Sequence, residues 1–263
     1  MSSAALYDIA GVSFAYNSTP VLDEMNLVLQ SGRFYGIVGP NGCGKTTFLD
    51  LLIGCKVPRT GTIRYKESPL ASYSKRDLAR ELALVPQEFD TGFGFTVEEI
   101  VLMGRHPHIE RFSAPSREDW ETVDRAMAAI GIGDLRHRYT NTLSGGQKQR
   151  AVVARAIAQN TPVVLFDEAT SSLDVKYTLQ IFNLARNLVR DEGRTVIAVI
   201  HNLNLAAAYC DHLIFMKDGR IRHHGPTHAT MTAETIAEVF DVHAQVTKDP
   251  FNQAFQVSFQ YWE

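Results

Sequence analysis

Apolar and polar residues alternate in the first part of the chain. The alternation is clear at residues 12–16 and again at 27–29, before the turn at Ser31-Gly32. A period of two is typical of strands with one buried face. Nearly continuous apolar runs follow at 34–38, 163–166 and 195–200. Such runs suit strands that are buried on both faces of a mostly parallel sheet.

The middle of the chain has a helical pattern instead. Three segments begin with a helix start signal: 96–103, which opens with Thr-Val-Glu-Glu; 120–130, which follows Ser116 and ends at Gly131; and 147–158, which follows Ser144. We therefore expect a helical insertion between strand–loop–helix segments. Near the C-terminus, residues 255–261 alternate again, which predicts an edge strand packed on the core.

Composition narrows the class of protein. The chain has 263 residues, of which 45% are hydrophobic, so a substantial core is expected. A net charge of -3 argues against nucleic acid as the main partner. No apolar run approaches the roughly 18 residues of a membrane span, and the first residues do not resemble a signal peptide. Three cysteines without metal-ligand spacing fit a reducing compartment, so we expect a soluble cytoplasmic protein.

A glycine-rich segment follows the apolar run at 34–38. It consists of Gly39, Pro40, Asn41, Gly42, Cys43, Gly44, Lys45 and Thr46, with Thr47 next, and it matches the phosphate-loop pattern G-x-x-x-x-G-K-[ST]. Glycines allow a tight turn whose N–H groups point at one anion, and the helix that follows adds positive potential. Lys45 is predicted to reach the β- and γ-phosphates, and the Thr46 hydroxyl to bind Mg²⁺. The pattern by itself is shared by kinases, GTPases and motors.

Two adjacent acids follow the run at 163–166. Asp167 is predicted to hold Mg²⁺ through water. Glu168 is expected on the opposite side of an extended chain, where it can act as general base on the attacking water. The alternative is an acidic pair that caps the next helix or lies in solvent. With a phosphate loop upstream, the second carboxylate favours hydrolysis over transfer to a bound acceptor.

A short motif precedes these acids by about 20 residues. It comprises Ser144, Gly145, Gly146 and Gln147 at the start of a predicted helix, which is a second anion-binding position. Taken alone, it could be an ordinary helix cap. After Leu143, however, it resembles the signature of ABC transporter ATPases, and kinases and GTPases lack it.

The resemblance extends to further positions. It implies that Tyr16 stacks on adenine, that Gln87 senses Mg²⁺ and water, and that His201 contacts the γ-phosphate. Ser172-Leu-Asp174 resembles the loop that communicates across a dimer, with Asp174 in that role. Ala169 departs from the family, which usually has proline there; the acids before it are intact.

The resemblance implies an α/β fold, with a RecA-like P-loop NTPase core, a small antiparallel β-subdomain and an inserted helical subdomain. One ABC ATPase domain is expected over residues 1–263, with the core in 1–86 and 161–263 and the helical subdomain in 87–160. It also implies ATP and Mg²⁺ as cofactors, and a homodimer on the cytoplasmic face of the membrane. The expected partners are two permease subunits and, indirectly, a substrate-binding protein, with no nucleic acid.

The segment from Met103 to His108, followed by Phe112, resembles importers of iron-siderophores, haem and cobalamin. In those proteins this surface lies near a groove that receives a permease helix. A molybdate or tungstate importer is a close alternative. A soluble ABC protein of DNA repair or translation and an exporter subunit are further alternatives, and a non-catalytic module is disfavoured by Glu168 and His201.

Overall fold

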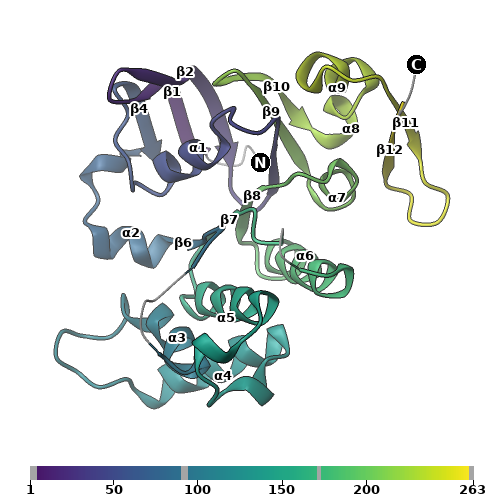
Figure 1. Ribbon diagram of the computed structural model, residues 1–263. Coiled ribbons are helices and arrows are strands. Elements are labelled where there is room, and N and C mark those ends of the chain that lie inside the picture. The colour runs from purple at the N-terminus through teal and green to yellow at the C-terminus, as the bar shows by residue number, and fades with distance from the viewer. Residues whose placement is uncertain (1–4, 90–93, 171–172, 261–263) are drawn as a thin grey trace. The chain divides into compact units, whose positions relative to one another are not determined.

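The computed structural model describes residues 5–89, 94–170 and 173–260, and Figure 1 shows its course. The chain forms two compact units. The first comprises residues 1–73 and 195–263, and the second comprises residues 74–194.

An antiparallel sheet forms one part of the first unit. Its strands are β1 (Ala5–Tyr16), β2 (Thr19–Gln30), β4 (Thr60–Tyr65) and β5 (Ser68–Pro69), in the order β2-β1-β4-β5, with the short 3₁₀ helix η1 (Leu70–Ser72) after them. The predicted alternation at 12–16 and 27–29 lies in β1 and β2, so it is confirmed as strand. Tyr7 is fully buried, and its hydroxyl donates to the carbonyl of Leu52 at 3.0 Å, which joins this sheet to helix α1 (Lys45–Leu52).

Four strands of a second sheet belong to the same unit. They are β10 (Arg220–Pro226), β9 (His212–Lys217), β3 (Phe34–Val38) and β8 (Thr195–Val199), which are neighbours in that order. β3 is parallel to both β8 and β9, and β10 is antiparallel to β9. Every residue of β3 and of β8 is buried. The continuous apolar runs therefore predicted buried parallel strands correctly.

Helices and a hairpin complete the first unit. They are α1 (Lys45–Leu52), α7 (Leu203–Tyr209), α8 (Thr227–Thr230), α9 (Ala233–Phe240) and the hairpin of β11 (Ala244–Lys248) and β12 (Phe255–Phe259). The predicted C-terminal strand is present as β12, which pairs with β11 and buries Val257; Tyr261, at the end of the predicted segment, lies outside the described residues. The side chain of Asn204 on α7 exchanges hydrogen bonds with the backbone of Val257 at 2.6 and 3.3 Å, so the hairpin is attached to α7.

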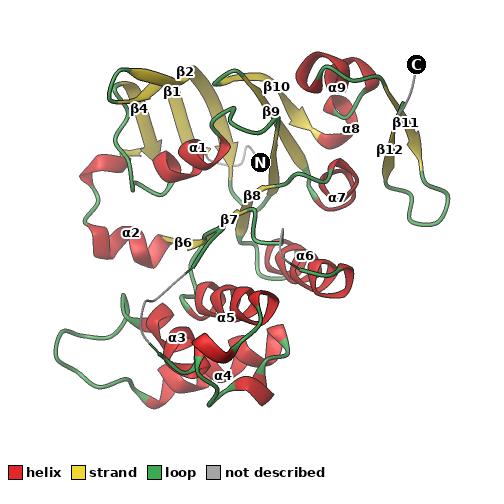
Figure 2. Cartoon of the chain, viewed as in Figure 1, coloured by secondary structure: helices red, strands yellow, loops and turns green. Residues whose placement is uncertain are grey.

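The second unit is largely helical. In chain order it contains α2 (Lys75–Glu81), β6 (Leu82–Val85), α3 (Val97–Leu102), η2 (Met103–Arg105), α4 (Arg117–Ile130), η3 (Gly133–Leu135), η4 (Thr140–Thr142), α5 (Gly145–Ala158), β7 (Val163–Asp167) and α6 (Val175–Arg190). β6 and β7 are parallel neighbours. Figure 2 shows that helices predominate between these two strands in the sequence.

The predicted helix starts are confirmed in this unit. Capping boxes are formed by Thr96 with Glu99, by Ser116 with Asp119, and by Ser144 with Gln147. The second helix begins at Arg117, three residues earlier than predicted, and the third begins at Gly145, two residues earlier, because Ser116 and Ser144 are themselves the N-caps.

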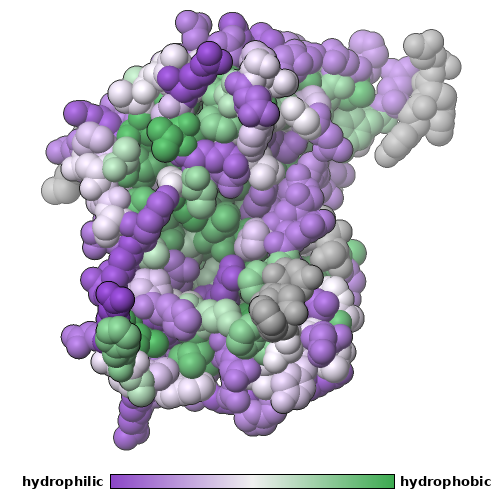
Figure 3. All heavy atoms as spheres, turned by 60° about the vertical axis from the view of Figure 1, so that its left-hand side comes forward, coloured by the Kyte–Doolittle hydropathy of each residue, from purple (hydrophilic) through white to green (hydrophobic). Residues whose placement is uncertain are grey.

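The strands and helices together confirm the predicted α/β class. Hydrophilic residues cover much of the outer surface in the face drawn in Figure 3, as expected when apolar strands fill the interior. Among the described residues, no helix is both long enough and apolar enough to cross a membrane.

Candidate nucleotide-binding site

The glycine loop connects β3 to α1 in the first unit. A Cβ atom on Gly39 would lie 2.1 Å from the carbonyl oxygen of Met216, so β9 leaves room only for glycine there. Gly44 has φ 98°, and a Cβ atom on it would lie 2.6 Å from Leu22 Cδ2. Both backbone conformation and close packing therefore require glycine at Gly44. These constraints explain the spacing of the motif without reference to a ligand.

Lys45 is buried within this loop. Its ammonium donates to the carbonyl oxygens of Gly39 and Pro40, at 2.9 Å each. The N-cap of α1 is Gly44, which offers no side-chain cap to the first N–H groups of the helix. A cation and the start of a helix therefore lie at one turn, an arrangement that suits a phosphate. The Thr46 side chain is exposed there, and Thr47 is buried.

Parallel pairing brings His201 to the same edge of the sheet as the glycine loop. Ile37 of β3 is paired with Val199 of β8, and the N–H of Ile200 donates to the carbonyl of Ile37 at 3.0 Å. Gly39 and His201 each follow their paired residue by two positions. The carboxyl ends of neighbouring parallel strands are where α/β folds bind ligands. Asn202 then caps α7, accepting from the N–H groups of Asn204 and Leu205.

Tyr16 is the last residue of β1, and its side chain is 46% exposed. The Phe14 ring meets it edge to face, with ring centroids 5.0 Å apart. The ammonium of Lys56 lies 5.1 Å from the centroid of the Tyr16 ring. An exposed, supported ring at a strand end is suited to stacking on a flat ligand. Sequence reasoning missed Lys56, because nothing in its local pattern marks it.

Gln87 and Glu168 meet in the second unit. The Nε2 of Gln87 donates to Oε2 of Glu168 at 2.8 Å. The parallel register explains this contact, because Val85 is paired with Phe166 and each side chain lies two positions further on. Asp167, the last residue of β7, is buried. Two carboxylates and an amide therefore gather at the carboxyl end of this strand pair, as expected for a site that orients water and a cation.

The backbone at Glu168 corrects one sequence expectation. Glu168 was expected on the opposite face of an extended chain from Asp167. The strand ends at Asp167, however, and Glu168 has a left-handed backbone with φ 49°. The alternation rule applies only to extended residues, so it does not set the direction of this side chain. Such conformations are uncommon in residues with side chains and are concentrated at functional sites.

The signature segment lies at the N-terminus of α5. The Ser144 hydroxyl accepts from the N–H of Gln147 at 3.3 Å, and the Gln147 side chain accepts from the N–H of Ser144 at 3.0 Å. Gly145 and Gly146 form the first turn. A Cβ atom on Gly145 would have no neighbour within 4 Å, so the approach to this helix end is open at that position.

Asp174 occupies a similar capping position. Its Oδ1 accepts from the N–H of Tyr177 at 3.0 Å, so Asp174 is the N-cap of α6. Ser172, which was expected in the same loop, lies outside the described residues. Ala169, in the position where proline was expected, is buried.

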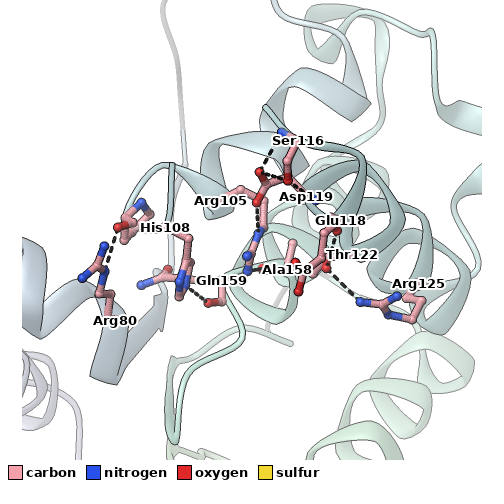
Figure 4. A network of polar contacts seen from close by, with 11 residues as sticks. Arg80, Arg105, His108, Ser116, Glu118, Asp119, Thr122, Arg125, Ala158 and Gln159 are labelled. Atoms are coloured by element: carbon pink, nitrogen blue, oxygen red, sulfur yellow. Dashed lines mark hydrogen bonds and ion pairs between the residues drawn. The ribbon is translucent and has the colours of Figure 1, made fainter. Parts of the chain in front are cut away.

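The segment from Met103 to Phe112 is held by several polar contacts (Figure 4). Arg105 is buried between the carboxylate of Asp119, at 2.9 Å, and the carbonyl of Ala158, at 2.9 Å. His108 contacts the Gln159 carbonyl at 2.8 Å. Phe112 is 95% exposed with φ 70°. Sequence reasoning singled out this segment but missed the pair of Arg105 and Asp119. The two residues are 14 positions apart, so no local pattern links them.

The fold and the glycine loop before α1 are those of a P-loop NTPase core. A family model described as "ABC transporter" matches residues 22–171, more than half of the chain. The chain belongs to the ABC transporter family, as the resemblance predicted.

The sequences of several characterised proteins support this family assignment. The chain is 39% identical, over 251 residues, to the cobalamin import ATP-binding protein BtuD of Halobacterium salinarum, covering 95% of this chain and 63% of that protein. It is 38% identical, over 261 residues, to the hemin import ATP-binding protein HmuV of Rhodopseudomonas palustris, covering 96% and 97%. The chain thus spans less than two thirds of the length of the BtuD relative.

Two solved structures are similar in fold. One is described as a metal-chelate type ABC transporter in an inward-facing conformation, with a TM-score of 0.83, 28% identity, and coverage of 98% of this chain and 97% of that one. The other is the dimeric ATP-binding cassette MJ0796 bound to ADP and Pi, with a TM-score of 0.74, 26% identity, and coverage of 84% and 98%.

Proposed function

We propose that this chain is the ATP-hydrolysing subunit of an ABC importer that takes up a metal chelate such as iron-siderophore, haem or cobalamin. The observation that carries the enzymatic part is the hydrogen bond between Gln87 and Glu168, next to the buried Asp167. A structural helix cap or a solvated acidic pair does not require a glutamine from a separate strand end. The cargo class is supported by the cobalamin and hemin relatives and by the metal-chelate structure.

The chain's own residues divide the chemistry among them. Lys45 and the backbone N–H groups of Gly39 and of residues 41–47 hold the phosphates of ATP. Glu168 accepts a proton from the attacking water, Gln87 senses Mg²⁺ and water, and His201 contacts the γ-phosphate and orders the water near Glu168. Tyr16 stacks on the adenine base.

The oxygen donors present fit Mg²⁺. Thr46 carries an exposed hydroxyl at the start of α1, and Asp167 carries a carboxylate at the end of β7. Hydroxyl, carboxylate and amide oxygens are the ligands that Mg²⁺ prefers. Thr46, Asp167 and Gln87 would hold the ion, which supplies charge neutralisation on the phosphates when bound.

A second copy of the chain completes the site in this proposal. Ser144, Gly145, Gly146 and Gln147 of one chain meet the γ-phosphate held by the other, and Asp174 communicates between the two. The dimeric cassette bound to ADP and Pi supports this arrangement. The division into a core of 1–86 and 161–263 and a helical subdomain of 87–160 remains part of the proposal.

The remaining partners follow from the importer assignment. Two permease subunits would anchor the dimer at the cytoplasmic face of the membrane, near the segment 103–112, and a substrate-binding protein would deliver the cargo. Nucleic acid is not expected as a partner. A molybdate or tungstate importer is the nearest alternative, and a soluble ABC ATPase is the next.

Replacing the general base tests the enzymatic assignment. We expect Glu168→Gln to lower ATP turnover by roughly 10²- to 10⁴-fold, because an amide cannot accept the proton from water. Steady-state release of phosphate measures this. Glu121→Gln, on the exposed face of α4, is the control and should hydrolyse ATP normally. Near-normal hydrolysis by Glu168→Gln would show that the base lies elsewhere.

Partner identification tests the transport assignment. The tagged chain, purified from gently solubilised membranes, should bring with it a protein with several membrane spans, identified by mass spectrometry. That partner's own sequence would then separate metal-chelate from oxyanion importers. Recovery of ribosomal or DNA-repair proteins alone would refute the transport role and leave the ATPase assignment in place.

A further inference from the structure

The Tyr16 ring contacts two side chains of the first unit, those of Phe14 and Lys56. On its own strand, Phe14 meets it at an interplanar angle of 88°. From the segment after α1, the ammonium of Lys56 lies 5.1 Å from the ring centroid. The ring remains 46% exposed. It is therefore supported, yet accessible to a ligand.

Lys56 is itself held in place by Asp50 of α1. The two side chains form an ion pair at 3.3 Å, and both are only about a quarter exposed, at 27% and 25%. The carbonyl of Asp50 also accepts from the N–H groups of Cys55 and Lys56, at 2.9 and 3.2 Å. Both the backbone and the side chain of Lys56 are thus fixed by one residue of the helix.

The charge on Lys56 is secure at neutral pH. A hydrogen bond with the Tyr16 side chain is the largest effect on the pKa of Lys56 and raises it. Burial comes next and opposes the rise, and the Asp50 carboxylate raises the pKa further. A protonated ammonium beside an aromatic ring is attracted by the ring's electron density.

Helix α1 connects this cluster to the phosphate loop. The helix begins at Lys45, which donates to the carbonyl groups of the loop, and Asp50 lies five residues further along the same helix. The position of Lys56 is therefore set by the element that also carries the phosphate-binding lysine.

We propose that Lys56, held by Asp50, is a positioning residue that orients the Tyr16 ring to stack on the adenine base. This inference rests on the proposed role of Tyr16 in nucleotide binding. A ring held in its binding orientation loses less side-chain freedom when the base stacks, so affinity rises without a direct contact between Lys56 and the nucleotide. An ordinary surface ion pair would have no such effect.

The effect can be measured with two ligands that differ in the base. The full chain and its variants are titrated calorimetrically with ADP and with inorganic pyrophosphate, both with Mg²⁺. We expect Lys56→Gln to weaken ADP binding about three- to fivefold, the size of a cation–aromatic contact at an exposed site. Pyrophosphate binding should not change, because pyrophosphate has no base to stack. Lys56→Arg keeps a cation that can pair with Asp50 and should bind ADP normally.

The chain provides a matched control. The ammonium of Lys66 lies 5.3 Å from the centroid of the Tyr65 ring, and Tyr65 is fully buried. A buried ring cannot stack on a ligand, so Lys66→Gln should bind ADP and pyrophosphate like the unmodified chain.

Tyr16→Ala separates this inference from the proposal on which it rests. If Tyr16→Ala weakens ADP binding and Lys56→Gln does not, the positioning role is wrong and the role of Tyr16 stands. If Tyr16→Ala binds ADP normally, both are wrong. If Lys56→Gln weakens ADP and pyrophosphate equally, Lys56 acts on the phosphate loop through α1, which also overturns the inference.

Discussion

At the scale of single residues, His108 shows how a local environment sets a protonation state. Its Nε2 lies 2.8 Å from the carbonyl oxygen of Gln159, an acceptor, so this nitrogen carries a proton. Partial burial lowers the pKa of His108 and outweighs the hydrogen bond to Gln159, and Arg105 and Arg80 lower it further. Asp119 acts in the opposite direction. The imidazole is therefore neutral at pH 7.

This lowered pKa predicts a pH dependence of stability. The unfolded chain takes up a proton on His108 as the pH falls through 6.5, while the folded chain does not. The neutral His108 side chain therefore contributes fully to the stability of the folded chain above pH 6.5. This contribution is lost as the pH falls from 6.5 towards the lower pKa of His108 in the folded chain. We expect acidification from pH 7.5 to 5.5 to lower the urea midpoint of the unmodified chain more than that of His108→Gln. Equal losses in the two proteins would contradict the shift.

At the scale of elements, one buried ion pair joins three of them. Arg105 lies at the end of η2, Asp119 in the first turn of α4, and Ala158 is the last residue of α5. Asp119 also accepts from the N–H and hydroxyl of Ser116 at 2.9 and 2.7 Å. Burial would raise the pKa of Asp119, but the hydrogen bonds from Ser116 and Arg105 hold it below its usual value. The contacts of Arg105 therefore hold the start of the segment 103–112 against α4 and α5.

Removing one partner of this pair is expected to be costly. Arg105→Ala leaves the Asp119 carboxylate buried without its cation, and losses of this kind are about 3–5 kcal/mol. The control is Arg117→Ala, which removes the pair between Arg117 and Glu121, where the Arg117 side chain is 93% exposed. That loss should be about 0–1 kcal/mol. Urea unfolding measures the free energy of unfolding of both variants. Similar losses in the two would show that burial does not determine how much the Arg105–Asp119 pair contributes to stability.

For the molecule as a whole, the residues proposed to act on the nucleotide belong to different units. The glycine loop, Tyr16 and His201 belong to the first unit, and Gln87, Glu168 and the signature segment belong to the second. The proposed dimer uses the signature of one copy at the phosphate loop of the other. Assembly is thus expected to depend on ATP and on the start of α5.

Size-exclusion chromatography can test this dependence. Glu168→Gln is expected to elute as a dimer with MgATP and as a monomer without it, because ATP that is not hydrolysed keeps joining the two chains. Adding Ser144→Arg should abolish the dimer, since a bulky side chain at the start of α5 blocks the partner's nucleotide. Binding of ADP to the monomer is the control and should persist. A double variant that still dimerises would refute the role of the signature segment.

The sequence alone determined the elements and much of the candidate site. The buried strands were predictable because parallel strands covered on both faces must be apolar throughout, as at 34–38 and 195–199. The helix starts were predictable because caps act within three or four residues, as at Thr96, Ser116 and Ser144. The phosphate loop was predictable for the same reason: its glycines and Lys45 act within a few residues of one another.

Which distant residues meet could be seen only in the folded chain. The contact between Gln87 and Glu168 depends on the register of β6 against β7, and the Arg105–Asp119 pair depends on how three helical segments pack. Local sequence patterns also did not predict the left-handed backbone at Glu168 or the pairing of β12 with β11. Periodicity and capping are short-range properties of the chain, whereas register, burial of charge and ring support arise from segments far apart in sequence. For that reason Lys56, 40 residues from Tyr16, could be recognised beside its ring only in the folded chain.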